Sequence, residues 1–197
     1  MRLREIVHIE RLAIPGLLLL TPKKHGDQRG FFSETFRGDL FGNEVKAPVS
    51  FVQDNHAYSA QKGVLRGLHF QLPPHAQGKL VRCIRGRILD VGVDIRAGSP
   101  TFGQHVAVEL SETNWKQLWV PAGFAHGYIT LEDHCEVIYK VTDYYGPECD
   151  RGIAWDDPSL SIDWQLPHTE ITLSDKDQKQ PRLADIASPF HYNELDG

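Results

Sequence analysis

The sequence predicts an all-β fold, a sandwich or barrel of short strands. Apolar and polar residues alternate in short segments separated by Gly, Pro and Asn, and helical periodicity is scarce. The hydrophobic fraction of 41% and the charged fraction of 24% are ordinary for a globular protein. A length of 197 residues fits one domain, and no repeat or linker divides it. We therefore expect a single domain over residues 1–197, with a few short peripheral helices.

The N-terminal part follows an apolar opening with polar and aromatic segments. Residues 27–30 are predicted to form a turn and residues 31–36 a strand, on which the Glu34 carboxylate lies on the same side as aromatic rings. Residues 38–48 are expected to hold one helical turn before an extended segment resumes at residue 51.

The clearest alternation lies in the middle of the chain. Residues 79–83 and 89–95 are predicted to be the two strands of a hairpin, with its turn at Arg85 and Gly86. A loop over residues 97–103 and a strand over residues 106–110 are expected to follow.

Two further strands carry polar residues that should face the interior. Pro121 and Gly123 bend the chain before a strand on which His126, Tyr128 and Thr130 share a face. In the next strand, residues 136–141, Tyr139 shares a face with two valines and is expected to point inward.

The pattern weakens after residue 145, so regular strands are expected to end there. Trp155 and Trp164 are the expected packing anchors of this loop-rich segment. From about residue 174 the tail should be polar and partly helical, because Ser174 stands three residues before Asp177, as an N-cap before an acidic first turn.

Charge and cysteine content exclude several classes of protein. A net charge of -5 argues against nucleic acid as the main partner. Apolar runs are too short to span a bilayer, and no signal peptide is recognisable, so we expect a cytoplasmic protein with no membrane partner. The cysteines Cys83, Cys135 and Cys149 lack CxxC spacing and should be reduced thiols.

Residues 65–79, LRGLHFQLPPHAQGK, are where the chemistry is expected. His69 stands between apolar neighbours in an extended segment, an arrangement that suits a general base but also a histidine satisfied by a neighbouring carbonyl. Arg66, Lys79 and Arg82 could line a basic pocket for an anionic small molecule, whereas Arg85 and Arg87 are better explained as a solvated edge.

The stretch PAGFAH at residues 121–126 has the PxGxxH spacing of the second cupin motif. The first cupin motif would supply HxH and a later carboxylate, but His69 is followed here by Gln71 and, downstream, Lys79. A neutral amide is a poor ligand for a transition metal and an ammonium repels one. We therefore expect no metal site.

Five separated motifs resemble the dTDP-4-dehydrorhamnose 3,5-epimerase family, over about residues 14–183. They read RGFFSETFR, QDNHAYSAQKGVLRGLHFQ, VPAGFAHGY, EVIYKVTDYY and SDKD, in that order. The resemblance implies a cupin jelly roll that forms a homodimer and works without metal or organic cofactor. It also implies inversion of C3 and C5 of dTDP-4-dehydro-6-deoxy-D-glucose on the route to dTDP-L-rhamnose.

The resemblance implies a role for four catalytic residues. His69 would be the base, oriented by Asp177, and Tyr139 would be the general acid. Lys79 has the charge to stabilise an enolate oxygen at C4. Without the resemblance, Asp177 is explained as well by a helix N-terminus, and Tyr139 by a core tyrosine with a satisfied hydroxyl.

Further positions match residues that contact the nucleotide sugar in the family: Arg29, Glu34, Gln53, Asn55, Arg66, His126 and Lys176. Tyr145 is the favoured residue to stack on thymine, and Asp150, or alternatively Glu148, is the acidic residue after it. Because strict alternation puts Arg66 and His69 on opposite faces, their joint use requires a bulge at Gly67. Family members often lend an N-terminal segment to the partner subunit, so residues near Arg29 and Glu34 would complete the neighbour's site.

Three other functions remain open at this point. A monofunctional C3 or C5 epimerase would use the same histidine and tyrosine. A metal-dependent cupin enzyme is disfavoured because His126 lacks its HxH partners. A non-catalytic cupin that senses a sugar nucleotide would keep the pocket without the chemistry.

Overall fold

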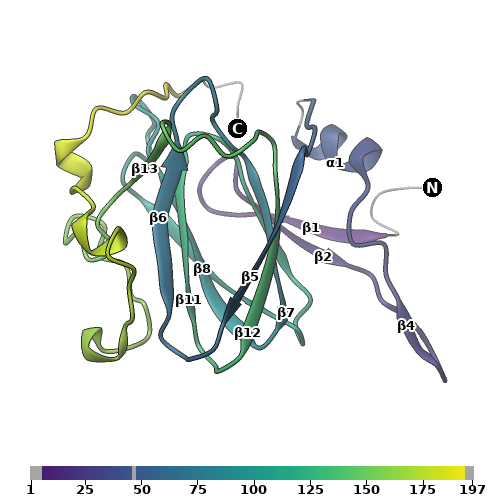
Figure 1. The fold of residues 1–197 in the computed structure, drawn as a ribbon. Coiled ribbons are helices and arrows are strands. Elements are labelled where there is room, and N and C mark those ends of the chain that lie inside the picture. Colours follow the sequence, from purple (N-terminus) through teal and green to yellow (C-terminus); the bar gives the residue numbers. More distant parts are fainter. Residues whose placement is uncertain (1–5, 46–47, 194–197) are drawn as a thin grey trace.

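Two antiparallel sheets face each other across the interior of the protein (Figure 1), for which the computed structural model describes residues 6–45 and 48–193. The first sheet has, in spatial order, β1 (Val7–Arg11), β2 (Leu18–Pro22), β10 (Gln117–Val120), β7 (Lys79–Arg85), β12 (Cys135–Val141) and β5 (Gln53–Ser59). The second has β13 (Asp150–Gly152), β6 (Leu65–Gln71), β11 (Phe124–Thr130), β8 (Arg87–Asp94) and β9 (His105–Ser111). A separate hairpin of β3 (His25–Asp27) and β4 (Gly30–Phe32) projects from the sheets. The predicted all-β sandwich is confirmed.

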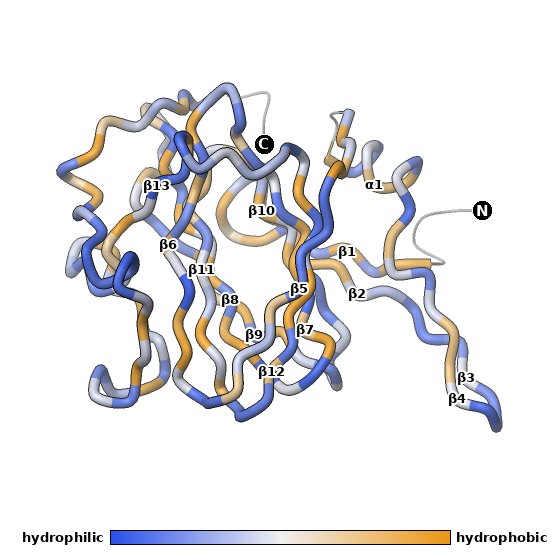
Figure 2. Tube along the Cα trace, in the orientation of Figure 1, coloured by the Kyte–Doolittle hydropathy of each residue, from blue (hydrophilic) through white to orange (hydrophobic). Residues whose placement is uncertain are grey.

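The core between the sheets is built from alternate residues of strands on both sides. Val81 of β7, Leu118 of β10 and Val137 of β12 meet Ile88 of β8 and Leu110 of β9. Each such aliphatic side chain contributes about 1.5–3 kcal/mol when fully buried. Hydrophobic residues run along β8 and β11 in Figure 2, and both strands are buried on both faces.

The outer faces of the two sheets are covered by different segments. The C-terminal segment lies over the second sheet, where Leu160, Trp164 and Leu183 join Leu89, and the Trp164 indole N–H donates to the Trp155 carbonyl at 2.9 Å. Both tryptophans are therefore the anchors that the sequence predicted. Aromatic rings from α1 (Gly38–Val45) and its flanks cover the first sheet, where Phe36, Phe41 and Phe51 pack around Trp119 of β10.

The predicted hairpin of residues 79–83 and 89–95 is wrong. β7 pairs with β10 and β12, whereas β8 pairs with β11 and β9, so the chain crosses from one sheet to the other at Gly86. Gly86 has a φ of +72°, and a Cβ there would lie 2.7 Å from the Cys135 sulfur. Alternation cannot distinguish two strands that pair in a hairpin from two consecutive strands in different sheets, because both arrangements have the same alternating pattern on each side of the turn.

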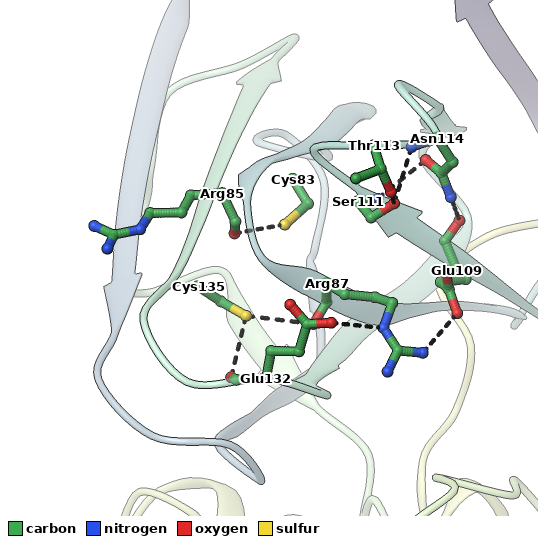
Figure 3. Close-up of polar contacts among 9 residues, drawn as sticks. All are labelled: Cys83, Arg85, Arg87, Glu109, Ser111, Thr113, Asn114, Glu132 and Cys135. Atoms are coloured by element: carbon green, nitrogen blue, oxygen red, sulfur yellow. Dashed lines mark hydrogen bonds and ion pairs between the residues drawn. The ribbon is translucent and has the colours of Figure 1, made fainter.

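The buried thiols of Cys83 and Cys135 lie beside the point where the chain passes from one sheet to the other (Figure 3). Cys83 donates to the Arg85 carbonyl at 3.0 Å, and Cys135 donates to the carbonyls of Arg87 and Glu132, each at 3.3 Å. The Arg87 guanidinium reaches Glu109 and Glu132 on the surface. All three cysteines are free, and Arg87 lies on a solvated edge, as predicted.

Three element boundaries also differ from expectation. Strand β4 ends at Phe32, so residues 33–36 are not a strand, because the Phe36 ring turns into the aromatic cluster. Helix α1 has eight residues, more than the single turn expected; residues 46–47 of the predicted segment lie outside the described residues. The short strand β13, paired with β6, lies beyond the predicted end of strands at residue 145.

The C-terminal segment has only short 3-10 helices among the described residues. These are η2 (His168–Glu170), η3 (Asp177–Lys179) and η4 (Leu183–Asp185). No helix in residues 6–45 and 48–193 is long and apolar enough to cross a membrane.

Candidate active site

A cavity of about 390 Å³ opens between the two sheets. The second sheet contributes Leu65, Arg66, His69, His126 and Tyr128, and the first sheet contributes Ala57, Lys79 and Tyr139. Residues 172–174 and Asp177 form its rim, from the C-terminal segment. Three of the four expected catalytic side chains thus come from three different strands, and the fourth comes from a segment far away in the sequence.

His69 and Asp177 form a hydrogen-bonded pair at the mouth of this cavity. His69 Nε2 lies 2.5 Å from Asp177 Oδ1, and the side chains are 29% and 4% exposed. The Ser174 hydroxyl donates to Asp177 Oδ2 at 2.9 Å and accepts the Asp177 N–H at 3.1 Å. Ser174 therefore orders the turn, as capping logic suggested, while the Asp177 carboxylate is directed at His69.

The environment keeps Asp177 ionised. Burial acts to raise the pKa of its carboxyl, but the hydrogen bond and charge of His69, the Ser174 hydroxyl and the Lys176 ammonium together hold that pKa below its usual value. A carboxylate on Nε2 fixes the ring proton there, so Nδ1 is the basic nitrogen of His69.

A bulge in β6 brings Arg66 and His69 to the same cavity. His126 pairs with His69 and Tyr128 pairs with Arg66, so two residues of β6 oppose the single Gly127 of β11. Gly67 has a φ of +131°, and a Cβ there would lie 2.5 Å from the Gly127 Cα. The bulge that the sequence required at Gly67 is confirmed.

Tyr139 and Lys79 lie on the wall opposite His69. Burial raises the pKa of the Tyr139 hydroxyl, which nearby Arg66 only partly opposes, so the phenol is protonated at neutral pH. Burial lowers the pKa of Lys79 to about 8, while the carboxylates of Asp150 and Asp90 act to raise it. The Lys79 ammonium lies 3.4 Å from the His69 carbonyl oxygen, and the two residues lie on different sheets.

A second cavity of about 310 Å³ adjoins the first and shares His69, Lys79 and Tyr139 with it. Its other polar residues are Gln53, Asn55, Gln71, Gln77, Tyr145 and Asp150. Gln53 donates to the Asn55 side chain at 2.8 Å and accepts the Tyr145 N–H at 3.2 Å. Asp150 accepts hydrogen bonds from the Tyr145 hydroxyl and the Lys176 ammonium.

The chain matches the family model described as dTDP-4-dehydrorhamnose 3,5-epimerase over residues 11–185. It is 52% identical to the dTDP-4-dehydrorhamnose 3,5-epimerase of Sinorhizobium fredii over 186 residues, which cover 94% of each chain. The chain belongs to the dTDP-4-dehydrorhamnose 3,5-epimerase family. It is therefore an isomerase of the epimerase class, and the resemblance found in the sequence is confirmed.

Solved structures agree with this family assignment. The dTDP-6-deoxy-D-glucose-3,5-epimerase of Legionella pneumophila, solved in complex with dTDP-4-keto-L-rhamnose, superposes with a TM-score of 0.90 at 45% identity, covering 95% of this chain and 99% of that one. ChmJ, a 3'-monoepimerase of Streptomyces bikiniensis solved with dTDP-quinovose, gives 0.82 at 35% identity, covering 89% and 87%. The cupin-type jelly roll is thus confirmed.

Arg29 and Glu34 line neither of these two cavities, whereas Lys176, which also lines neither, is bonded to Asp150 of the second one. Arg29 is at the tip of the projecting β3–β4 hairpin, with its side chain 89% exposed and paired to Asp27. Glu34 borders a different, apolar pocket beside α1. Within one chain, the structure brings neither side chain to His69.

Sequence reasoning missed Asp90 and the contribution of Tyr128. His126 Nε2 donates to Asp90 Oδ1 at 2.7 Å, and the Asp90 side chain is fully buried on β8. Tyr128 lines the cavity beside His126. A carboxylate within the otherwise apolar run ILDVGV is a signal that could have found Asp90, since an unpaired charge is costly to bury.

Gln71 stands at the position of a cupin metal ligand, but its side-chain amide is hydrogen-bonded to backbone groups. Its amide donates to the carbonyls of His75 and Tyr144 at 2.6 and 3.1 Å and accepts the Gly146 N–H at 2.8 Å. No group of three or more His, Cys, Asp or Glu side chains in the described part of the chain is placed to hold a metal ion. Gln71 instead orders the loop that carries Tyr145.

Proposed function

We propose that the protein inverts C3 and C5 of dTDP-4-dehydro-6-deoxy-D-glucose to give dTDP-4-dehydro-L-rhamnose, without a metal or organic cofactor. Both carbons flank the 4-keto group, so removal of either proton gives an enolate that the ketone stabilises. Each inversion then needs a base on one face of the sugar ring and an acid on the other.

One observation carries this proposal: His69 and Tyr139 line a shared cavity from opposite sheets. His69, held by Asp177 through Nε2, offers Nδ1 as the base. Tyr139 keeps its proton because burial raises its pKa, so it can return a proton from the opposite wall. Removal on one face and return on the other is inversion.

Lys79 is the proposed stabiliser of the enolate oxygen at C4. A buried ammonium that needs no reorganisation during the reaction is effective in this role, and losing one such donor typically costs about 100-fold to 1,000-fold in rate. Because the pKa of Lys79 is about 8, most of these ammonium groups are charged at neutral pH.

The nucleotide is proposed to occupy the second cavity. Gln53 and Asn55 offer amides and Tyr145 an exposed ring for stacking on thymine. Lys176, which does not line the cavity but is bonded to Asp150 of its lining, offers a cation for the diphosphate. Asp150 holds Tyr145 and Lys176 in place through its hydrogen bonds. Arg66 and His126 are the proposed polar contacts of the hexose in the first cavity.

A homodimer would explain the position of Arg29 and Glu34. The hairpin that carries Arg29 projects from the sheets and exposes Phe31 and Phe32, as an arm that reaches a partner subunit would. In this arrangement, each arm completes the site of the neighbour. We also propose that the chain acts as one domain in the cytoplasm, for which fractionation of cells producing the tagged protein is the test.

The test is turnover of the 4-keto sugar nucleotide in deuterium oxide, followed by NMR. We expect deuterium at C3 and C5 and the L-rhamno product. The Tyr139→Phe variant should still exchange the protons, because His69 remains, but should return deuterium to the original face. Deuterium at only one carbon would identify a monofunctional epimerase, and no deuterium at either carbon would refute the proposed function.

A further inference from the structure

Tyr128 has a buried hydroxyl without a hydrogen-bond partner. The residue lies on β11 and is 4% exposed. Among the described residues, only two buried side-chain polar atoms lack a partner, the Tyr128 hydroxyl oxygen and Asp90 Oδ2. Because Tyr128 and Asp90 are cross-strand partners, both atoms belong to the same part of the protein. An unpaired buried hydroxyl is costly, so this concentration calls for a physical reason.

The surroundings of Tyr128 are those of the hexose site. Tyr128 lines the 390 Å³ cavity together with His69, Lys79 and Tyr139, and it pairs across the strands with Arg66. It does not line the second cavity, which holds the residues proposed for the nucleotide. Whatever approaches Tyr128 from the cavity is therefore the part of the substrate that lies away from the nucleotide.

The hydroxyl of Tyr128 is a donor at the pH at which the enzyme works. Burial raises the pKa of this phenol, and nearby Arg66 opposes the shift while Tyr139 and Asp90 add to it. The protonated phenol can give its hydrogen to an oxygen atom that enters the cavity. The 4-keto hexose has such atoms at C2, C3 and C4, whereas the thymidine diphosphate is expected elsewhere.

We propose that Tyr128 contacts the substrate, donating a hydrogen bond from its hydroxyl to an oxygen of the hexose. The inference rests on the proposed function and adds a contact to it. Tyr128 is then distinct from Tyr139, which gives its proton to carbon, because Tyr128 keeps its proton and positions the ring between His69 and Tyr139. Binding the hexose supplies the partner that the hydroxyl lacks.

The variant Tyr128→Phe removes this one oxygen and tests the proposal. We expect kcat/KM to fall about 10-fold, as for the loss of a hydrogen bond made in the reacting complex. Binding of dTDP alone, measured by calorimetry, should be unchanged, because dTDP has no hexose. The melting temperature of the ligand-free variant should be equal or higher, because the hydroxyl has no partner to lose.

Tyr58→Phe is the matched control. Tyr58 lies on the edge strand β5, is 50% exposed and lines neither cavity. Its hydroxyl bonds His134, which precedes β12. We expect its kcat/KM to equal that of the parent. A Tyr128→Phe enzyme within about twofold of the parent would overturn the proposal, as twofold is below the effect of a typical hydrogen bond.

Three other results would also count against the contact. If Tyr128→Phe lowers the melting temperature, the hydroxyl has a structural role and the inference is wrong. The inference is also wrong if the variant weakens the binding of dTDP by the same factor as it lowers kcat/KM. If the parent protein does not turn over the sugar nucleotide at all, the proposed function fails first and the inference fails with it. If the parent turns over the sugar nucleotide and Tyr128→Phe has the same kcat/KM, only the Tyr128 contact is refuted and the proposed function stands.

Discussion

Two histidine–aspartate pairs lie side by side in this protein, and they differ in how they meet the cavity. His69 and His126 are cross-strand partners on β6 and β11. Each donates from Nε2 to an aspartate, at 2.5 Å to Asp177 and at 2.7 Å to Asp90. The His69 side chain is 29% exposed, whereas the His126 side chain is 7% exposed. The chemistry of the pairs is the same, but their access to the cavity is not.

The difference comes from where each aspartate lies in the fold. Asp177 is 108 residues from His69, on a surface segment where Ser174 holds its second oxygen. Asp90 is on the strand next to His126, and its second oxygen has no partner among the described residues. An open, fully bonded pair suits repeated proton transfer. A buried pair suits a fixed ring that shapes the wall of the cavity.

The largest effect is expected for His69→Ala. Loss of the base should lower kcat by about 100-fold to 10,000-fold. The stability should stay within about 1 kcal/mol, because Asp177 keeps the hydrogen bond of the Ser174 hydroxyl. His126→Ala should instead destabilise the protein by about 1–3 kcal/mol, because Asp90 is left buried without a partner. Urea unfolding and steady-state kinetics measure both.

His56→Ala is the control for this comparison. His56 is on the exposed edge strand β5 and pairs with Glu136 on the surface, so neither activity nor stability should change appreciably. The comparison fails if His126→Ala abolishes turnover while the protein remains as stable as the parent. That result would give the buried histidine a direct part in the reaction, in place of a structural one.

The aspartates should give a smaller contrast. Asp177→Asn should lower kcat by about 100-fold, because an amide cannot stabilise the imidazolium that forms during proton transfer. Asp90→Asn should lower it by less than about 10-fold, since an amide oxygen can still accept from His126. The pH profile of kcat separates the two, because only Asp177→Asn should shift the limb that reports the base. Equal profiles would mean that the pairs are interchangeable.

The contrast between the pairs could be predicted only in part from the sequence. Alternation located β8, β11 and β12 and placed Tyr139 inward, and incompatible faces for Arg66 and His69 predicted the bulge at Gly67. These inferences succeeded because they depend on neighbouring residues. Alternation failed at Gly86, where the same pattern leads to a different sheet.

The pairing of His69 with Asp177 came from family resemblance, because a separation of 108 residues gives no local signal. Local reasoning placed Asp177 at a helix start, and Ser174 does bond its backbone there. Asp90 was missed although its apolar neighbours were visible, because strand patterns reveal burial and not the partner across the sheet. Tertiary contacts of charged groups are what a single sequence specifies least.

The smallest effect is expected in the pH dependence of kcat that comes from Lys79, on the cavity wall opposite His69. Lys79 has a pKa lowered to about 8 by burial, so its charge is lost as pH rises through that value. If the ammonium stabilises the enolate, kcat should fall on the alkaline side with an apparent pKa near 8, leaving about one-tenth of the groups charged at pH 9. Lys79→Arg should move this limb to higher pH, because a guanidinium keeps its charge.

Stability should change in the opposite direction. The folded protein binds the Lys79 proton less tightly than the unfolded chain does, so between about pH 8 and 10.4 the unfolded state holds more protons and stability rises with pH. Lys79→Met should therefore be more stable than the parent at pH 7, and this advantage should shrink above pH 8, while its activity is low throughout. A Met variant that is less stable than the parent at pH 7 would show that the Lys79 side chain supports the fold, contrary to this expectation.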